Sequence, residues 1–505
     1  MKPWILGSVS AAAFIAIPAA GWSLTAQEAW EKWQTAAASY GQEMTNDGEQ
    51  TMDGKLTIRG VALNSDVDGM TVAVKIDEVS FAEQDDGSVA VTLSDSFPLT
   101  VNGTDPESGE KVDAVVTVAQ PGMTMTASDA DGGTAFSYDA PSLSVSLTEL
   151  KVDDVAIPMQ ITVALNDTLG NYAVKAEAGS PMESSFEAAG IVVDIDVSDP
   201  EGPGKLSVDA TIDGITSTSF ASGLDSAETE DMAKMLADGF AVEGKAEYGP
   251  VSFAFDFDES GETAKANGSL TGGGIDFGLN ADGMRYDVGY EGLDVAVSGS
   301  EIPFPQVTVK AAAAATRVML PVLQTESAEP FAFRTALEGL ELGEEIWSLF
   351  DPAAVLPRDP ATLIVDLAGT GRWTLDIFDE EAMLAVESSG ETPGELETVE
   401  LKELMLSVGG AELSGTGAFK IDNTDMETFG GVPRPEGTAN VRLVGGNGLL
   451  DNLTKMGLVP EDQVMMVRMM TGMFAKPGPG QDELLSEITV DGNGQLLING
   501  APMPF

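Results

Sequence analysis

The chain has 505 residues, of which 82 are acidic and 25 basic, so its formal net charge is −57 at pH 7. It contains no cysteine and no histidine, which excludes disulfides, thiolate metal sites and any catalysis or metal binding through imidazole. Nucleic acid is excluded as a partner, because phosphate binding needs clustered Lys and Arg. We therefore expect a protein that is not an enzyme and that holds no cofactor and no metal.

The N-terminus has the pattern of a secretory signal. Lys2 precedes an apolar stretch from Ile5 to Ala20, and small residues at Ala19–Ala20–Gly21 suit a signal peptidase. We expect residues 1–23 to be a signal peptide and the mature chain to be periplasmic. The alternative is an inner-membrane anchor at residues 4–21, although this stretch is short for the roughly 20 residues of a spanning helix.

A short helix is predicted next. Thr25 and Glu28 form a capping box, in which hydroxyl and carboxylate satisfy free amide groups at a helix start, and Gly41 is a plausible end. Large and small apolar residues then recur at helical spacing at Trp30, Trp33, Ala37 and Tyr40. The helix either packs as a lid on the first sheet or docks a partner.

From about residue 50 to 310 the sequence alternates between apolar and polar residues. Residues 72–76, 206–212 and 251–257 each alternate in this way, and Asp-Gly pairs such as Asp213–Gly214 separate the stretches. Strands joined by such tight turns predict an antiparallel sheet. We expect a mainly β fold: an elongated antiparallel meander, curled into a sheet, groove or half-barrel, with capping helices near the N-terminus, in the middle and near the C-terminus.

The middle of the chain carries further helix signals and a change of composition. Helices are predicted over Ser226–Phe240 and Ala336–Phe350, and strands resume near Leu363. The alanine-rich run Ala311–Ala315 favours a boundary between a β-rich region at 24–310 and a second one at 311–505. The alternative is one continuous domain over residues 24–505.

The C-terminal part combines two predicted helices with a closing hairpin. The first helix begins at Leu449, and the second begins at Pro460 and is apolar almost all round; the hairpin follows over 484–498. The residues singled out there are Met456, Met465, Met466, Met469, Met470, Met473 and Phe474. They could line a hydrophobic groove that accepts acyl chains, because methionine is flexible and polarizable. The other interpretation is a core helix covering the sheet, for which Met469→Asp would be strongly destabilising.

Two stretches resemble part of a calcium-binding loop. Asp256–Gly261 and Asn64–Gly69 each reproduce the first half of an EF-hand loop, but the twelfth positions are Asn267 and Lys75 rather than glutamate. Both stretches also coincide with predicted hairpin turns. The sequence therefore favours turns over metal sites.

Several strings resemble an uncharacterised bacterial family, the domain of unknown function 2125. They are Phe350–Asp351–Pro352, Leu356–Pro357–Arg358–Asp359–Pro360, Met456 to Gln463, Arg468–Met469–Met470, Gly472 to Ala475, Asn499–Gly500 and, near the N-terminus, Trp30, Trp33 and Tyr40–Gly41. The resemblance implies an exported, β-rich envelope protein; it implies no activity and no functional residues. More loosely, the pattern is similar to AsmA-like envelope proteins, which are thought to handle lipid in a β-groove.

These observations predict an exported envelope protein that is not an enzyme and holds or passes a lipid in an apolar β-groove. Its partners would be lipid or another envelope protein, and it would not be integral to the membrane unless the N-terminal segment stays uncleaved. The alternative is a structural or protein-interaction module with a filled core. A carboxylate-based hydrolase rests only on the abundance of Asp and Glu.

Overall fold

The computed structural model describes residues 24–39, 43–67, 69–105, 108–130, 133–175, 181–200, 202–223, 231–389 and 392–503. The predicted signal segment at 1–23 and the helix end at Gly41 lie outside these residues. The described chain contains 28 strands and six helices, with 63% of residues in strands and 12% in helices. The predicted mainly β, antiparallel fold is confirmed. The chain divides into two compact units, residues 1–225 with 255–261 and residues 226–254 with 262–505, and each is described by itself.

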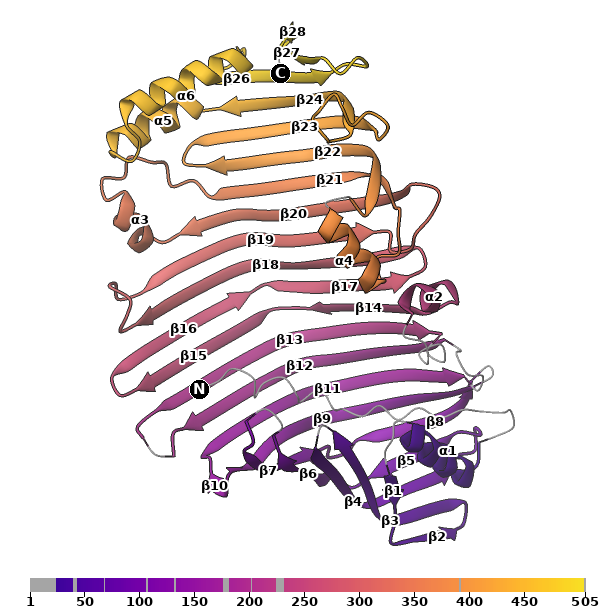
Figure 1. Ribbon diagram of the computed structural model, residues 1–505. Helices are drawn as coiled ribbons and strands as arrows, with labels where there is room; N and C mark the ends of the chain where they lie inside the picture. Colours follow the sequence, from indigo (N-terminus) through magenta and orange to yellow (C-terminus); the bar gives the residue numbers. More distant parts are fainter. Residues whose placement is uncertain are drawn as a thin grey trace. The chain divides into compact units, whose positions relative to one another are not determined.

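The described residues of unit 1 form one helix and a set of antiparallel strands (Figure 1). Its elements are α1 (Ala26–Ser39), β1 (Glu43–Thr45), β2 (Gly48–Met52), β3 (Lys55–Val67), β4 (Met70–Glu83), β5 (Val89–Leu93), β6 (Ser96–Thr104), β7 (Lys111–Ala119), β8 (Thr124–Ala130), β9 (Gly133–Val152), β10 (Val155–Ala156), β11 (Met159–Lys175), β12 (Met182–Ser198) and β13 (Lys205–Ser222). The longest of these pair side by side in the order β9, β11, β12, β13. Ile161 of β11, for example, lies opposite Leu147 of β9 and Ile195 of β12, as the predicted alternation requires.

A closed hydrophobic core lies beneath α1. The Trp30 ring contacts the rings of Trp33 and Phe81 at centroid distances of 6.1 and 5.9 Å, and Ile58 and Val79 are fully buried beside them. The indole Nε1 of Trp30 donates a hydrogen bond of 3.0 Å to Glu49, which satisfies its one polar atom. The interpretation of this helix as a lid on the first sheet is confirmed.

The capping box at the start of α1 is also confirmed. The Thr25 amide donates to the Glu28 carboxylate at 2.9 Å, and the Glu28 amide donates to the Thr25 hydroxyl at 3.2 Å. The Thr25 hydroxyl also donates to the Glu28 carboxylate, at 2.8 Å, and the two bonds that this carboxylate accepts from Thr25 lower the pKa of Glu28. Two of the free amides at the helix start are therefore satisfied by side chains.

We predict that Trp30→Ala destabilises unit 1 by about 3–5 kcal/mol, because the truncation leaves a cavity in a closed core. The measurement is urea-induced unfolding followed by tryptophan fluorescence and far-UV circular dichroism. Met52→Ala is the control, since that side chain is 65% exposed, and it should change the free energy of unfolding by less than about 0.5 kcal/mol. Equal effects of the two substitutions would contradict the assignment of the core.

In unit 2, the part of the chain that the structure describes forms five helices and most of the remaining strands (Figure 1). The helices are α2 (Met232–Ala237), α3 (Glu344–Phe350), α4 (Glu380–Ser389), α5 (Gly446–Lys455) and α6 (Glu461–Phe474). The strands are β14 (Ala241–Tyr248), β16 (Glu262–Leu270), β17 (Gly272–Asn280), β18 (Gly283–Gly299), β19 (Val307–Leu320), β20 (Glu329–Leu342), β21 (Ala361–Trp373), β22 (Gly394–Val408), β23 (Ala411–Asp422), β24 (Arg434–Val444), β25 (Lys476–Pro477), β26 (Glu483–Val490), β27 (Leu496–Ile498) and β28 (Ala501–Pro502), while β15 (Val251–Glu259) is divided between the units. From β14 the pairing runs through β17, β18, β19, β20, β21, β22, β23 and β24 to β26, antiparallel at every step.

The structure corrects the predicted helix at 336–350. Only residues 344–350 are helical, as α3, while 336–342 continue β20. Strand formation prevails because β20 is paired on both sides, with Thr335 opposite Thr316 of β19 and Val365 of β21. Residues with high helix propensity, such as Ala, Leu and Glu, adopt a strand when the strands on both sides supply backbone hydrogen-bond partners.

Of the other elements predicted for this region, the structure changes some and confirms others. The run Ala311–Ala315 lies inside β19, and Ala311 is buried, so the change in composition there does not interrupt the strand. The helix predicted at 226–240 is shorter, since α2 spans 232–237, and residues 224–230 lie outside the described range. The two C-terminal helices and the closing hairpin of β26 and β27 are confirmed.

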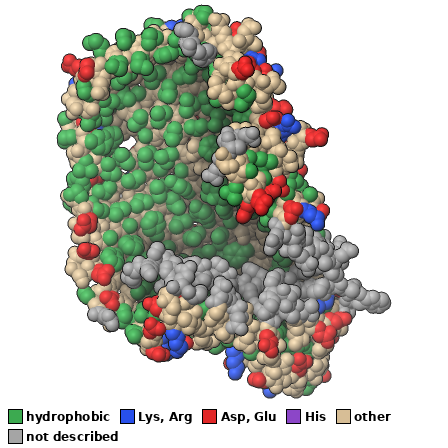
Figure 2. Space-filling view, viewed as in Figure 1, with side chains coloured by type: hydrophobic (Ala, Val, Ile, Leu, Met, Phe, Trp, Pro, Cys, Tyr) green, Lys and Arg blue, Asp and Glu red, His purple; other side chains and the backbone are tan. Residues whose placement is uncertain are grey.

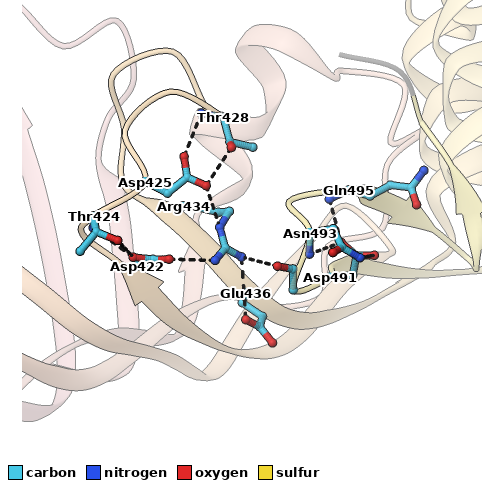
Figure 3. A network of polar contacts seen from close by, with 10 residues as sticks. Asp422, Thr424, Asp425, Thr428, Arg434, Glu436, Asp491, Asn493 and Gln495 are labelled. Carbon is cyan, nitrogen blue, oxygen red and sulfur yellow. Dashed lines mark hydrogen bonds and ion pairs between the residues drawn. The ribbon is translucent and has the colours of Figure 1, made fainter.

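One arginine organises the connection between β23 and β24. Arg434 donates to Asp422 at 2.8 Å, to Asp425 at 2.9 Å and to the carbonyl of Gly492 at 3.1 Å (Figure 3). Its first carboxylate partner, Asp422, has a lowered pKa, mainly because the hydroxyl and amide of Thr424 donate to it and also because of Arg434. The residues between β23 and β24 are thereby tied to the turn between β26 and β27.

Candidate functional site

The strands of unit 2 place their apolar residues on one face, which we call the apolar face. It takes four residues from each of ten successive strands, assigned from the register of strand pairing. They are Val242, Gly244, Ala246, Tyr248; Gly273, Ile275, Phe277, Leu279; Met284, Tyr286, Val288, Tyr290; Ala314, Thr316, Val318, Leu320; Phe331, Phe333, Thr335, Leu337; Leu363, Val365, Leu367, Gly369; Val399, Leu401, Leu404, Leu406; Leu413, Gly415, Gly417, Phe419; Gly437, Ala439, Val441, Leu443; Leu484, Ser486, Ile488 and Val490. Not one of these residues is charged, and hydroxyl groups are their only polar side-chain atoms.

The opposite face of the same strands carries the charges. Arg285 pairs with Asp276 at 2.9 Å, and Arg334 reaches both Asp366 and Glu403 at 3.1 Å. Further cross-strand pairs join Arg317 to Asp287 and Arg442 to Glu483. The sheet therefore carries its ion pairs on one face, which we call the ionic face, opposite the forty uncharged residues of the apolar face.

The apolar face is not covered as a protein core would be. Among its residues only Val490 is buried, whereas Ile275, Phe333, Leu363 and Leu406 are 38–40% exposed. The other residues of the face are half-buried. Figure 2 shows hydrophobic side chains gathered over the strands of unit 2 in a hollowed surface, with charged side chains along its margins. An apolar surface of this extent on a protein marks a binding site.

The dimensions of the face follow from strand geometry. Ten strands spaced about 4.8 Å apart cover about 43 Å across the strands, and four alternate residues cover about 20 Å along each strand. An acyl chain in one leaflet of a bilayer extends through about half of a 30 Å hydrocarbon core, or roughly 15 Å. The face is therefore large enough for several acyl chains.

The methionines predicted as groove-lining residues are mostly exposed, and five of them lie on α6. Met465, Met466, Met469, Met470 and Met473 are 48–72% exposed, Phe474 is 38% exposed and Met456, next to α5, is half-buried. In Figure 1, α5 and α6 lie beyond the ends of β22–β24, on the same side of the unit 2 sheet as α3. That they line the apolar face itself stays a prediction. The interpretation of α6 as a buried core helix is wrong, because only Val464 of this helix is buried.

The side of α6 that faces the protein is held by polar contacts. Arg468 donates to the side chain of Asn447 at 3.0 Å and to Asp451 of α5 at 2.8 Å. The Phe474 carbonyl accepts hydrogen bonds from Ser486 at 2.6 Å and from Asn499 at 3.2 Å. The helix therefore buries Val464 against the protein, is tied to its neighbours by these polar contacts, and leaves its methionines exposed.

Sequence reasoning missed the exposed apolar side chains beside the methionines. Leu349 and Phe350 at the end of α3 and Leu458 between α5 and α6 are exposed. In the sequence, the Phe350–Asp351–Pro352 string marks the end of α3. The pattern within one helix does not show which of its sides the surrounding elements leave exposed.

A buried carboxylate fixes the chain after α3. Asp351 is fully buried and accepts hydrogen bonds from the amides of Val355 and Leu356, both at 2.9 Å, and from Arg358 at 2.6 Å. The Arg358 guanidinium also lies 4.2 Å from the centre of the Trp347 ring. Burial by itself would raise the pKa of Asp351, but these hydrogen bonds and the Arg358 charge outweigh it, so the pKa lies below its ordinary value.

The position of α6 gives a test of its exposure. Met469→Asp should change the free energy of unfolding by less than about 0.5 kcal/mol, because that side chain is 64% exposed. Val464→Asp should cost several kcal/mol, because that side chain is 5% exposed and a carboxylate there would be buried without a partner. Urea-induced unfolding measures both, and a strongly destabilised Met469→Asp variant would restore the buried-helix interpretation.

The depressed pKa of Asp351 predicts how its contribution to stability depends on pH. A carboxylate with a lowered folded-state pKa stabilises fully above its unfolded-state pKa, ordinarily near 3.8, and loses that effect as pH falls through the folded-state value. Asp351→Asn should therefore be destabilising at pH 7, with the difference from wild type shrinking below pH 3.8. Thermal unfolding of both proteins across the pH range measures this, and a difference independent of pH would contradict it.

The described residues show no metal site. No group of three or more acidic side chains there is placed to hold a metal ion. A hollow on the ionic side of β14, β17, β18 and β19 contains Lys245, Asp276 and Asp287, and the two aspartates already pair with Arg285 and Arg317. The described helices include none with the length and hydropathy needed to cross a membrane.

Comparison with known proteins identifies a family. Residues 240–503, just over half of the chain, match the family described as "Uncharacterized protein conserved in bacteria (DUF2125)". The protein belongs to this family. The match covers the apolar face, α3 and α6, whereas the N-terminal strings at Trp30, Trp33 and Tyr40–Gly41 lie outside it. No curated protein and no solved structure matches the chain, so the analogy to AsmA-like proteins stays a prediction.

Proposed function

We propose that this DUF2125 protein is not an enzyme but binds lipid, with acyl chains lying on the apolar face of unit 2. The observation that carries the proposal is a face of ten strands that has no charged side chain and stays half exposed. Leaving so much apolar surface in water is unfavourable, and its burial is favourable in proportion to its area. The free protein therefore has a strong drive to bind an apolar ligand.

The chemistry of the face favours acyl chains over a protein partner. Protein interfaces carry about one hydrogen bond per 100–200 Å², whereas this face offers only a few hydroxyl groups, such as those of Thr316 and Thr335. An acyl chain needs no hydrogen bonds and adapts to an uneven surface. The alternative of a structural module with a filled core is disfavoured by the exposure of Ile275 and Leu363.

Export of the protein is the second part of the proposal. The N-terminal signal pattern at residues 1–23 supports a periplasmic location, with a membrane anchor at 4–21 as the alternative. A lipid carrier of the envelope would operate in that compartment, where lipids must cross water between membranes. The proposal therefore combines a periplasmic location with lipid binding on the apolar face.

The test compares two neighbouring residues on opposite faces of β22. Leu404→Glu places a charge in the middle of the apolar face, whereas Met405→Glu places the same charge on the ionic face. Uptake of a fluorescent fatty acid should fall at least about tenfold in Leu404→Glu, since desolvating the carboxylate costs more than the 1.4 kcal/mol that a factor of ten represents. Met405→Glu should bind as wild type does.

Native lipid provides the second measurement. Protein purified from its own host is extracted with organic solvent and analysed by mass spectrometry, and we expect lipid in wild type and Met405→Glu but not in Leu404→Glu. Circular dichroism confirms that each variant is folded. Wild-type protein free of lipid that also takes up no fatty acid would remove the proposal.

A further inference from the structure

The outer side of α6 is an apolar stripe fixed in position. At about 100° per residue, its five methionines fall within an arc of about 140°, and they are Met465, Met466, Met469, Met470 and Met473. Most surface helices present the reverse arrangement, with the apolar side toward the protein. Because Arg468 and Phe474 hold the helix to its neighbours, it cannot bury the stripe by turning over without breaking these bonds.

Other exposed apolar side chains lie on the same edge of unit 2. Leu349 and Phe350 project from α3, and Leu458 lies between α5 and α6. The segment after α3 and helix α5 meet at one place, since a Cβ atom built on Gly409 would lie 3.1 Å from Leu449 and 3.6 Å from Leu356. We define the helical edge as Leu349, Phe350 and Leu458 together with the five methionines of α6.

The helical edge adjoins the apolar face. Ser486, whose hydroxyl donates to the Phe474 carbonyl at the end of α6, belongs to the last strand of that face. The C-terminal end of the methionine stripe therefore lies beside β26. An acyl chain leaving the face at this strand would meet an apolar helix rather than charged side chains.

We propose that the helical edge docks the protein on the surface of a neutral phospholipid bilayer, where the apolar face takes up or delivers acyl chains. This proposal rests on the lipid-binding function proposed above. Unbranched, flexible methionine side chains suit a fluid acyl surface, as in helices that lie in the plane of a membrane. The net charge of −57 disfavours anionic membranes, so the surface that fits is one of zwitterionic lipid.

Vesicle flotation tests the proposal with the full chain. The probes are phosphatidylcholine vesicles and vesicles with one third phosphatidylglycerol. Wild type should float with the neutral vesicles and less with the anionic ones. The double variant Met469→Asp/Met473→Asp should lose about 100-fold in partitioning, because each methionine contributes about a tenfold factor when it is buried in lipid.

The matched control is Met52→Asp in β2 of unit 1, which substitutes a methionine of similar exposure far from α6 in the sequence and should float as wild type does. Wild type that does not float, or a double variant that floats normally, would overturn the docking. The docking would also be overturned if light scattering showed that wild type is a dimer, that the double variant is a monomer, and that wild type does not bind vesicles. Fatty-acid uptake in solution separates the two proposals, since the double variant should keep it whereas Leu404→Glu should lose it but still float.

Discussion

The structure depends on the pairing of antiparallel strands, whose backbone hydrogen bonds hold a sheet together whether or not both of its faces are covered. In unit 2, the alternation of side chains sends the paired charges of ten strands to one face and leaves the four residues that each strand gives to the apolar face uncharged. In most proteins a helix layer or a second sheet covers such a face. Here its side chains stay partly exposed, and this is the surface on which the proposed lipid binding would take place.

The two units show different ways to stabilise a sheet. Unit 1 has an aromatic core under α1, built on Trp30, Trp33 and Phe81. Unit 2 instead has cross-strand ion pairs on its outer face, such as those of Arg334 and Arg442. Exposed pairs of this kind contribute at most about 1 kcal/mol each, but they also fix register, because a slip of one residue would turn charges onto the apolar face.

Much of this fold could be predicted from the sequence, because period-two alternation and Asp-Gly turns are local signals. The helix predicted at 336–350 fails at 336–342 because Leu337 and Leu340 satisfy a helical spacing as well as a strand, and only pairing with β19 and β21 decides between them. The methionines of α6 stand out in the sequence, but which side of the helix is exposed depends on tertiary contacts, such as the burial of Val464 and the hydrogen bond from Arg468 to Asp451. The apolar face likewise needs the register between strands, which no single strand encodes.

The acidic composition and the apolar face have a common physical consequence. A large exposed apolar surface normally drives copies of a protein together, and a second copy would be the most available partner. Each copy carries a net charge of −57, and like charges repel over about 10 Å at 0.1 M salt. An uncharged lipid meets no such repulsion. The net charge therefore disfavours self-association and binding to anionic surfaces, which is consistent with the proposed binding of neutral lipid on the apolar face.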